Sequence, residues 1–289
     1  MAAIVISPVN RKGGVGKSSS VFHLGGFFAS RGMRVLLVDN EPQHSLTNGL
    51  IGPDRAGKLS PDHTTAALFD TRRQPTAKDL IRETQFTQID LMCGSDALDL
   101  YNGPIDNLSS DRPLVLKRFL DTVRADYDII LIDNPPNLQL CTYSSLAASD
   151  FAYCITKPQE YDVQGVVPVQ RAVDRVLQST NPKLRFVGYV LNMVQARRSL
   201  HASYEALLRK TYGPKVFNTT VPDWNDFAEA LTARSPVSLY KPQSKASQVT
   251  AALAVELVKR MEAARKRPPE LQIRRQQKSQ PKHQKAGVS

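Results

Sequence analysis

Short apolar runs alternate along the chain with longer segments in which apolar residues recur every three or four positions. Several of the runs have consecutive apolar positions rather than alternating ones, a pattern typical of strands that are covered on both faces of a parallel sheet. The runs predict strands at Ile4–Val9, Arg34–Asp39, Ile89–Cys93, Asp128–Asp133, Phe151–Thr156, Phe186–Met193 and Val216–Val221. The helical spacing predicts helices at 17–31, 113–125, 160–178, 199–212 and 244–266.

This alternation of strands and helices predicts an α/β fold, with a doubly wound, mostly parallel sheet and helices on both faces. One domain is expected over residues 1–265, followed by a basic and disordered tail over 266–289. Two stretches rich in Gly, Pro and polar residues, 49–62 and 99–112, are expected to be long loops.

Composition limits the classes of function. The 289 residues are 41% hydrophobic and carry a formal charge of +11, but 259–289 alone hold ten Lys or Arg against two Glu. Such a tail indicates a polyanion partner, nucleic acid or anionic lipid, with a solubilising end as the alternative. The three cysteines lack C-x-x-C spacing, which argues against a disulfide framework. No apolar run predicts a transmembrane helix or a secretory signal, so we expect a cytoplasmic protein.

The clearest chemical motif lies between the first predicted strand and the first predicted helix. Glycines there let backbone N–H groups converge on phosphate oxygens at a helix N-terminus. Lys17 is expected to reach the β- and γ-phosphates, and the Ser18 hydroxyl to bind Mg²⁺. Arg11 replaces the first glycine of the general G-x-x-x-x-G-K-[ST] pattern, and Lys12 adds a second lysine. The predicted nucleotide-binding residues of the loop are Gly13, Gly14, Val15, Gly16, Lys17, Ser18 and Ser19.

Two predicted strands end in an acidic residue, Asp39 and Asp133. The carboxyl ends of parallel strands face the crevice in which such sheets bind ligands. With a nucleotide on the loop, Asp133 is expected to serve Mg²⁺ directly or from the second shell of ligands, and Asp39 through a water. Asp39, Glu41 and His44 could instead form a transition-metal trio, but their place beside a phosphate loop favours Mg²⁺.

Together these residues resemble the ParA/MinD family of P-loop ATPases, and most closely its ParA/Soj-type partitioning members. The hallmark is the second lysine, matched here by Lys12, and the resemblance covers most of residues 2–265. In that family the front lysine crosses to the nucleotide of the partner subunit in an ATP-sandwich dimer. The resemblance therefore implies a P-loop NTPase fold, ATP and Mg²⁺ as cofactors, and an ATP-dependent homodimer.

The resemblance also carries a departure at the catalytic position. The family reads D-x-D-P-Q after the strand that ends at Asp39, and its second Asp positions or polarises the attacking water. This chain has Glu41 there, so the expected catalytic residues are Lys12, Lys17 and Glu41. An extra methylene moves the carboxylate by about an ångström, and such an error can cost roughly a hundredfold in rate. We therefore expect a slow, partner-dependent ATPase.

Three further positions match the part of the family's site near the adenine. Asn192 matches a base-contacting Asn or Thr position, and Pro222 and Asp223 match an I-P-R segment. Asp223 replaces the usual Arg. Adenine selectivity is implied by the resemblance alone.

The partitioning ATPases of this family bind non-specific DNA as ATP-bound dimers, and a ParB-like protein on the cargo stimulates hydrolysis and release. The resemblance thus implies a nucleoid-associated protein that segregates DNA or positions a protein cargo. A solvated helix face is the alternative role for each basic residue. The candidate DNA contacts are Arg197, Arg198, Lys241, Lys245, Arg265, Lys266 and Arg267.

Two other functions stay open on the same scaffold. A MinD-like membrane regulator needs a C-terminal amphipathic helix with a free apolar face, and beyond residue 266 only Leu271, Ile273 and Val288 are apolar. A metabolic or iron–sulfur reductase needs paired cluster cysteines or a substrate site, and the cysteines lack that spacing.

Overall fold

The computed structural model describes residues 2–105 and 111–266, without the side chains of 160–165. In this part of the chain, eight strands form one sheet in the order β3-β4-β2-β5-β1-β6-β7-β8. Every neighbouring pair is parallel except β3 with β4. The strands are β1 Ile4–Val9, β2 Val35–Asp39, β3 Ile81–Glu83, β4 Ile89–Met92, β5 Ile129–Asp133, β6 Phe151–Thr156, β7 Arg185–Val194 and β8 Val221–Pro222.

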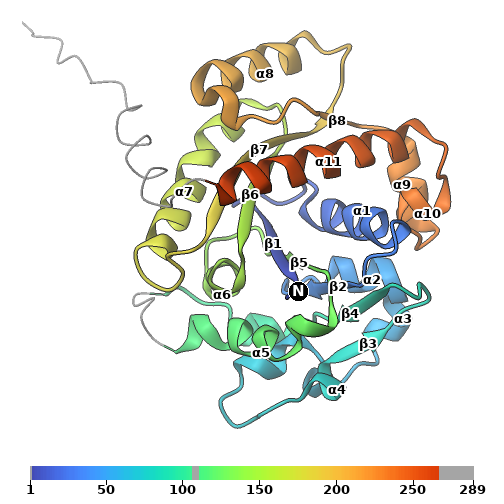
Figure 1. Ribbon diagram of the computed structural model, residues 1–289, viewed down its shortest axis with the longest axis vertical. Coiled ribbons are helices and arrows are strands. Elements are labelled where there is room, and N and C mark those ends of the chain that lie inside the picture. The colour runs from blue at the N-terminus through green and yellow to red at the C-terminus, as the bar shows by residue number, and fades with distance from the viewer. Residues whose placement is uncertain (1, 106–110, 267–289) are drawn as a thin grey trace, which may run out of the picture.

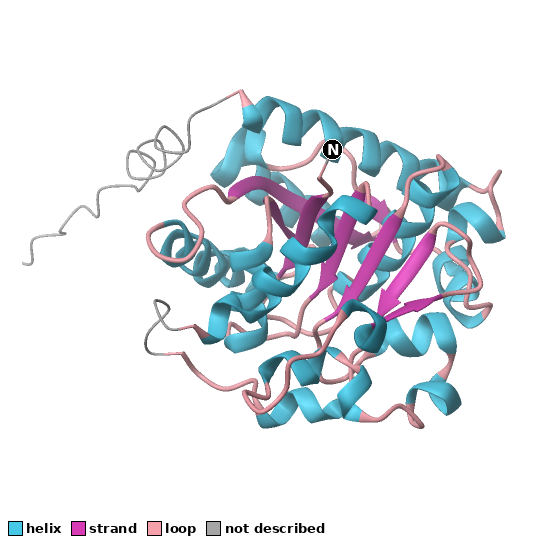
Figure 2. Ribbon diagram, turned by 60° about the horizontal axis from the view of Figure 1, so that its bottom comes forward, coloured by secondary structure: helices cyan, strands magenta, loops and turns pink. Residues whose placement is uncertain are grey.

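Helices cover both faces of this sheet (Figures 1 and 2). The α-helices are α1 Lys17–Ser30, α2 Ser45–Ile51, α3 Pro53–Ala56, α4 Ala77–Leu80, α5 Val115–Val123, α6 Leu140–Ala148, α7 Glu160–Leu177, α8 Ser199–Tyr212, α9 Asn225–Thr232, α10 Val237–Tyr240 and α11 Lys245–Arg265. Short 3-10 turns lie at Pro61–His63, Thr65–Phe69, Asp96–Leu100, Arg112–Leu114, Arg124–Asp126 and Gly213–Lys215.

Successive side chains of a strand point to opposite faces of the sheet, so each strand packs against different helices on its two faces. On β5, Leu131 belongs to the apolar cluster that α1 and α11 complete, whereas Ile130 and Ile132 pack with α5. A third cluster joins β6 and β7 to α6, α7 and α8. The predicted doubly wound α/β fold is therefore confirmed.

Helix α11 is part of the core. Its Leu253, Leu257 and Met261 are buried in the cluster with α1. The apolar face that a membrane-binding helix would need is thus already covered in this helix. Within the described ranges, none of the helices combines the length and apolarity needed to cross a bilayer.

Two expectations about elements were wrong. The stretch 49–62 is not one loop, because α2 runs into it and Pro53, after a left-handed Gly52, begins α3. The predicted strand Val216–Val221 is interrupted because the N–H groups of Asn218 and Thr219 donate to the Glu256 carboxylate of α11 rather than to β7. Only the bridge Tyr189–Val216 and β8 remain of it.

Strand β3, the antiparallel edge, was missed because it is only three residues long. The loop expected at 99–112 begins within a 3-10 turn and ends within another, while 106–110 lie outside the described residues. The expected tail from 267 onward also lies outside them, so the domain boundary stays a prediction.

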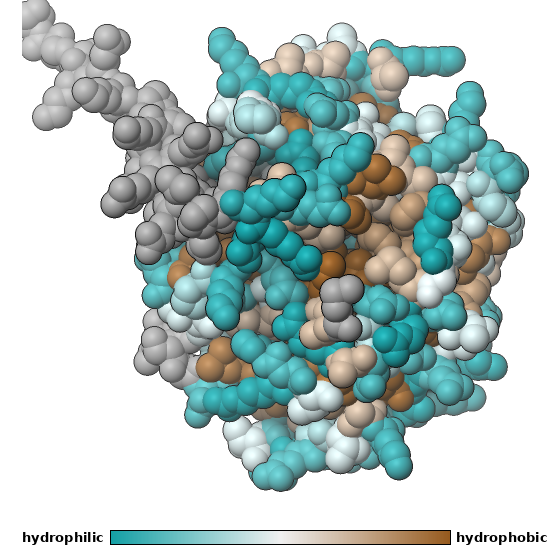
Figure 3. Space-filling model, viewed as in Figure 1, coloured by the Kyte–Doolittle hydropathy of each residue, from teal (hydrophilic) through white to brown (hydrophobic). Residues whose placement is uncertain are grey.

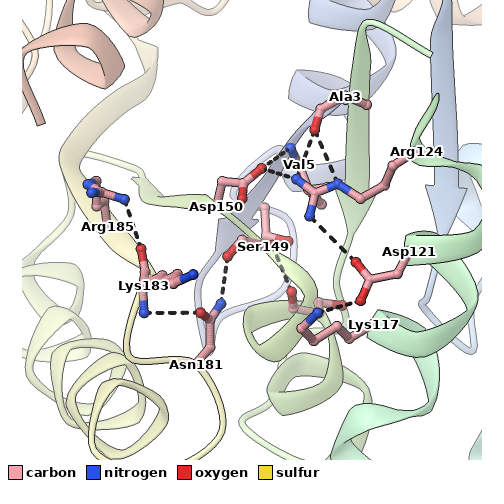
Figure 4. A network of polar contacts seen from close by, with 12 residues as sticks. Ala3, Val5, Lys117, Asp121, Arg124, Ser149, Asp150, Asn181, Lys183 and Arg185 are labelled. Atoms are coloured by element: carbon pink, nitrogen blue, oxygen red, sulfur yellow. Dashed lines mark hydrogen bonds and ion pairs between the residues drawn. The ribbon is translucent and has the colours of Figure 1, made fainter. Parts of the chain in front are cut away.

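A polar network joins the amino ends of the central strands β1 and β6 (Figure 4). Arg124 donates to the carbonyl of Ala3 at 2.8 Å and to Asp150 at 2.6 Å. The same Asp150 oxygen accepts the N–H of Val5 at 2.9 Å. These are the amino ends of parallel strands. The network therefore lies opposite the carboxyl ends of the strands, which carry the candidate site.

Candidate functional site: a phosphate loop beside buried carboxylates

The glycine loop connects β1 to α1, and its backbone explains its sequence. Gly14 and Gly16 have φ of 66° and 94°, in the left-handed region that favours glycine. Gly16 is the residue that precedes α1. A Cβ atom on Gly16 would lie 2.1 Å from Nδ2 of Asn192. The loop therefore brings its backbone against β7 in a way that only glycine allows.

Asn192 holds the loop from the other side. Its Nδ2 donates to the carbonyl of Val15 at 2.8 Å, and the residue is buried. The next residue, Met193, adopts a left-handed φ of 55° at a bulge between β7 and β8. Such conformations are strained for a side chain of this size and occur where the surroundings enforce them.

The two lysines of the loop lie differently. Lys17 is buried, and its Nζ donates to the carbonyl of Lys12 at 3.1 Å. Burial lowers the pKa of Lys17, and the charges of Asp133 and Glu41 oppose that shift. Lys12 is half-buried at the front of the loop, and its backbone N–H donates to Asn10 Oδ1 at 3.0 Å.

Asp39 and Asp133 are paired across β2 and β5, and both are fully buried. Burial raises the pKa of both carboxyl groups. Asp39 uses its oxygens within the protein: Oδ2 accepts from the N–H and hydroxyl of Thr47 at 2.8 and 2.7 Å, and Oδ1 accepts the N–H of Glu41 at 3.3 Å. Asp39 is thus held as an anchor for the segment that carries Glu41.

The two carboxylate oxygens of Asp133 have different surroundings. Its Oδ1 accepts the N–H of Asn134 at 2.9 Å, whereas Oδ2 is buried and has no hydrogen-bond partner within the described ranges. The pKa of Asp133 lies well above its usual value, because of burial first and then the charges of Asp39 and Glu41. A buried acceptor without a partner suits a cation or its bound water.

Glu41 faces the start of α1. Its Oε2 accepts a weak hydrogen bond from the Ser18 hydroxyl at 3.4 Å. Burial raises the pKa of Glu41, and the charge of Asp39 adds to the shift.

Ser18 and Asp133 fit a hard cation such as Mg²⁺, which takes oxygen ligands and keeps several from phosphate and water. Within the described ranges, no three His, Cys, Asp or Glu residues are grouped to hold a metal by themselves.

A cavity of about 170 Å³ opens beside Ser19. Asn192, Pro222 and Asp223, which the sequence places near the base, all line it. Asp223 Oδ2 accepts from Gln195 Nε2 at 2.6 Å. The cavity also has lining residues that sequence reasoning missed: His23, Met193, Trp224 and Phe227. No motif spacing marked them, and Thr47 was missed for the same reason.

The candidate DNA contacts that the structure describes belong to several segments of the chain. Arg197 and Arg198 are exposed before α8, whereas Lys245 and Arg265 are the two ends of α11, about 30 Å apart at 1.5 Å per residue. Lys241 already pairs with two carboxylates, Asp226 and Glu229. Lys266 is exposed, and Arg267 lies outside the described residues. Hydrophilic side chains dominate the face drawn in Figure 3, with smaller apolar groups among them.

The site has the features of a P-loop NTPase: a glycine loop after the first strand, a lysine at the end of that loop, and carboxylates on the neighbouring parallel strands. The family model described as an AAA domain matches residues 3–186. The sporulation initiation inhibitor protein Soj of Bacillus subtilis is 31% identical over 255 residues, which cover 88% of this chain and 97% of that protein. The chain belongs to this family of ParA/Soj P-loop ATPases.

Two further comparisons agree. The chromosome partitioning protein ParA of Caulobacter vibrioides is 32% identical over 260 residues, covering 89% of this chain and 94% of the relative. Among solved structures, cobyrinic acid a,c-diamide synthase from Mycobacterium smegmatis with bound ADP and magnesium superposes with a TM-score of 0.73. At 24% identity, with 92% of this chain and 98% of that chain covered, it shows the fold. The resemblance to the ParA/MinD family is confirmed.

Proposed function

We propose that this chain is an ATP-dependent partitioning or positioning ATPase that cycles between a monomer and an ATP-sandwich dimer. The observation that carries the proposal is a loop with two lysines, of which Lys17 is buried with its Nζ on the carbonyl of Lys12. Lys17 donates to the loop's own carbonyl, the place that a phosphate would take. A second lysine beside it costs like-charge repulsion, which the phosphates of a partner subunit would offset.

Within one subunit, the residues divide the work of hydrolysis. Lys17 binds the β- and γ-phosphates, while Ser18 and Asp133 hold the cation. Mg²⁺, once held there, would supply positive charge for the phosphates. Asp39, fixed by Thr47, positions the backbone of Glu41, and Glu41 orients the attacking water. The base of ATP lies in the cavity lined by Asn192, Pro222 and Asp223.

The dimer binds non-specific DNA, and a ParB-like protein on the cargo stimulates hydrolysis and release. The relatives support this reading, since Caulobacter ParA is a chromosome partitioning protein. Contacts to several phosphates would come from the exposed residues around α8, Arg197 and Arg198, and from the basic residues that begin at Arg265. The protein would then be cytoplasmic and associated with the nucleoid.

Dimerisation tests the role of Lys12. Lys12→Ala should still bind a non-hydrolysable ATP analogue but dimerise at least tenfold more weakly, as measured by sedimentation velocity over a range of protein concentrations. Arg11→Ala, which removes an exposed charge from the adjacent position, is the matched control and should dimerise like the unmodified chain. A Lys12→Ala dimer of undiminished strength would contradict the sandwich arrangement.

A further inference from the structure

A second cavity lies away from the phosphate loop, where α2 and α3 meet the β3–β4 turn and the α9–α10 turn. In Figure 1 the helices of this region gather along one side of the molecule. The cavity has a volume of about 290 Å³, near the lower end of small-molecule sites, which run from roughly 300 to 1,000 Å³. Its size therefore suits a small ligand.

Arg234 is placed at this cavity by its backbone. It has a left-handed φ of 52°, its N–H donates to the carbonyl of Leu231 at 3.0 Å, and its own carbonyl accepts from Gln85 Nε2 at 2.8 Å. A non-glycine residue adopts a left-handed conformation only where its surroundings enforce it. The turn and Gln85 together hold Arg234 in it.

The guanidinium of Arg234 rests on a glycine. A Cβ atom on Gly52 would lie 2.7 Å from Cζ of Arg234, so the group packs directly against the Gly52 backbone. Gly52 itself has a left-handed φ of 86°. The backbone conformation therefore favours glycine at this position, whereas the guanidinium, at the end of a flexible side chain, could shift to admit a Cβ atom.

The charges that face the cavity are unbalanced. Arg55 and Arg234 both line it, against one carboxylate, Asp54. Among the described residues, neither guanidinium has a hydrogen-bond or ion-pair partner. A guanidinium presents a planar set of donors that matches phosphate and carboxylate oxygens. We propose that this cavity binds a small polyanion with phosphate or carboxylate groups, held by Arg55 and Arg234.

The cavity borders two elements of the nucleotide site. Leu50 and Ile51, which line it, belong to the helix that follows the Glu41 segment. Leu231, which accepts the N–H of Arg234, lines the cavity assigned to the base. A bound polyanion would therefore tie α2 to the α9–α10 turn beside the nucleotide.

Isothermal titration of the full chain with pyrophosphate tests the site, and citrate separates carboxylate from phosphate recognition. All variants carry Lys17→Ala to suppress binding at the phosphate loop, and the buffer holds about 0.15 M salt to screen the basic tail. Arg55→Ala and Arg234→Ala should each weaken binding at least tenfold. Asp54→Asn should strengthen it.

Lys58→Ala, which removes an exposed charge outside the cavity, is the matched control and should leave the affinity unchanged. Absence of binding for both anions would overturn the proposal. Equal losses in the Arg234→Ala and Lys58→Ala variants would overturn it too, because they would indicate general attraction to surface charge. Neither result depends on whether the chain hydrolyses ATP.

Discussion

Glu41 stands where the resemblance to the family implies an Asp, and we expect its longer side chain to slow hydrolysis. It is anchored through its N–H to Asp39 and reaches Ser18 with its longer side chain. Glu41→Asp shortens the side chain by one methylene and should move the carboxylate away from the cation ligand. We expect steady-state ATP turnover to rise by roughly ten- to a hundredfold.

Release of inorganic phosphate, followed continuously at saturating ATP, measures this effect. Glu41→Gln serves as the matched control, because it keeps the length but removes the charge and should be slower than the unmodified chain. An Asp variant with an unchanged rate would refute the idea that the length of Glu41 limits hydrolysis.

His23 gives a second test at the scale of one residue. Burial lowers its pKa from the usual 6.5 to about 3, and its Nδ1 accepts the N–H of Val237 at 3.1 Å. Below pH 6.5 the unfolded chain therefore takes up a proton that the fold excludes. The free energy of unfolding should fall as the pH drops, by about 2 kcal/mol between pH 7 and pH 5 from this group.

Urea unfolding of His23→Asn at several pH values isolates this contribution. Asn can still accept the N–H of Val237 but does not titrate, so the stability gap to the unmodified chain should narrow by that amount as the pH falls. The exposed His63→Asn is the control. A gap that stays constant with pH would show that His23 is not held neutral by burial.

At the scale of elements, the Arg124 network fastens the amino ends of β1 and β6. Arg124→Ala removes a charged donor that is about a fifth exposed, so the Ala3 carbonyl loses this donor and Asp150 keeps only the N–H of Val5. We expect the free energy of unfolding to fall by about 1–2 kcal/mol, since partial exposure reduces the value of such bonds. Chemical unfolding checks this.

Because the network lies opposite the phosphate loop, ATP turnover of the folded Arg124→Ala variant should be unchanged. Lys117→Ala removes only an exposed pair with Asp121 and should cost little, within about 0.5 kcal/mol. A turnover defect in Arg124→Ala would mean that the amino ends and the carboxyl ends of the strands are coupled.

The elements also show where sequence reasoning succeeded and where it stopped. Continuous apolar runs identified β1, β5 and β6 because burial on both faces leaves few polar positions. The glycine loop could be recognised because its residues follow one another in the sequence. The pairing of Thr47 with Asp39, the Asn192 bond to Val15 and the Glu256 bonds that interrupt Val216–Val221 depend on residues brought together only by the fold.

For the whole molecule, the central claim is that ATP assembles a DNA-binding dimer. The charge along the sequence alone cannot locate the DNA surface, because the described basic residues are dispersed and Lys241 is paired. A surface formed by two subunits would gather residues that one subunit keeps apart. Binding through several phosphates should also weaken steeply as salt rises.

The most direct measurement is binding to random-sequence duplex DNA with ATP, ADP or no nucleotide, for the full chain and for residues 1–265. We predict binding that requires ATP and survives removal of the tail, because the dimer itself supplies the surface. Binding that ignores nucleotide and disappears with the tail would contradict the account, as would binding to anionic vesicles with none to DNA.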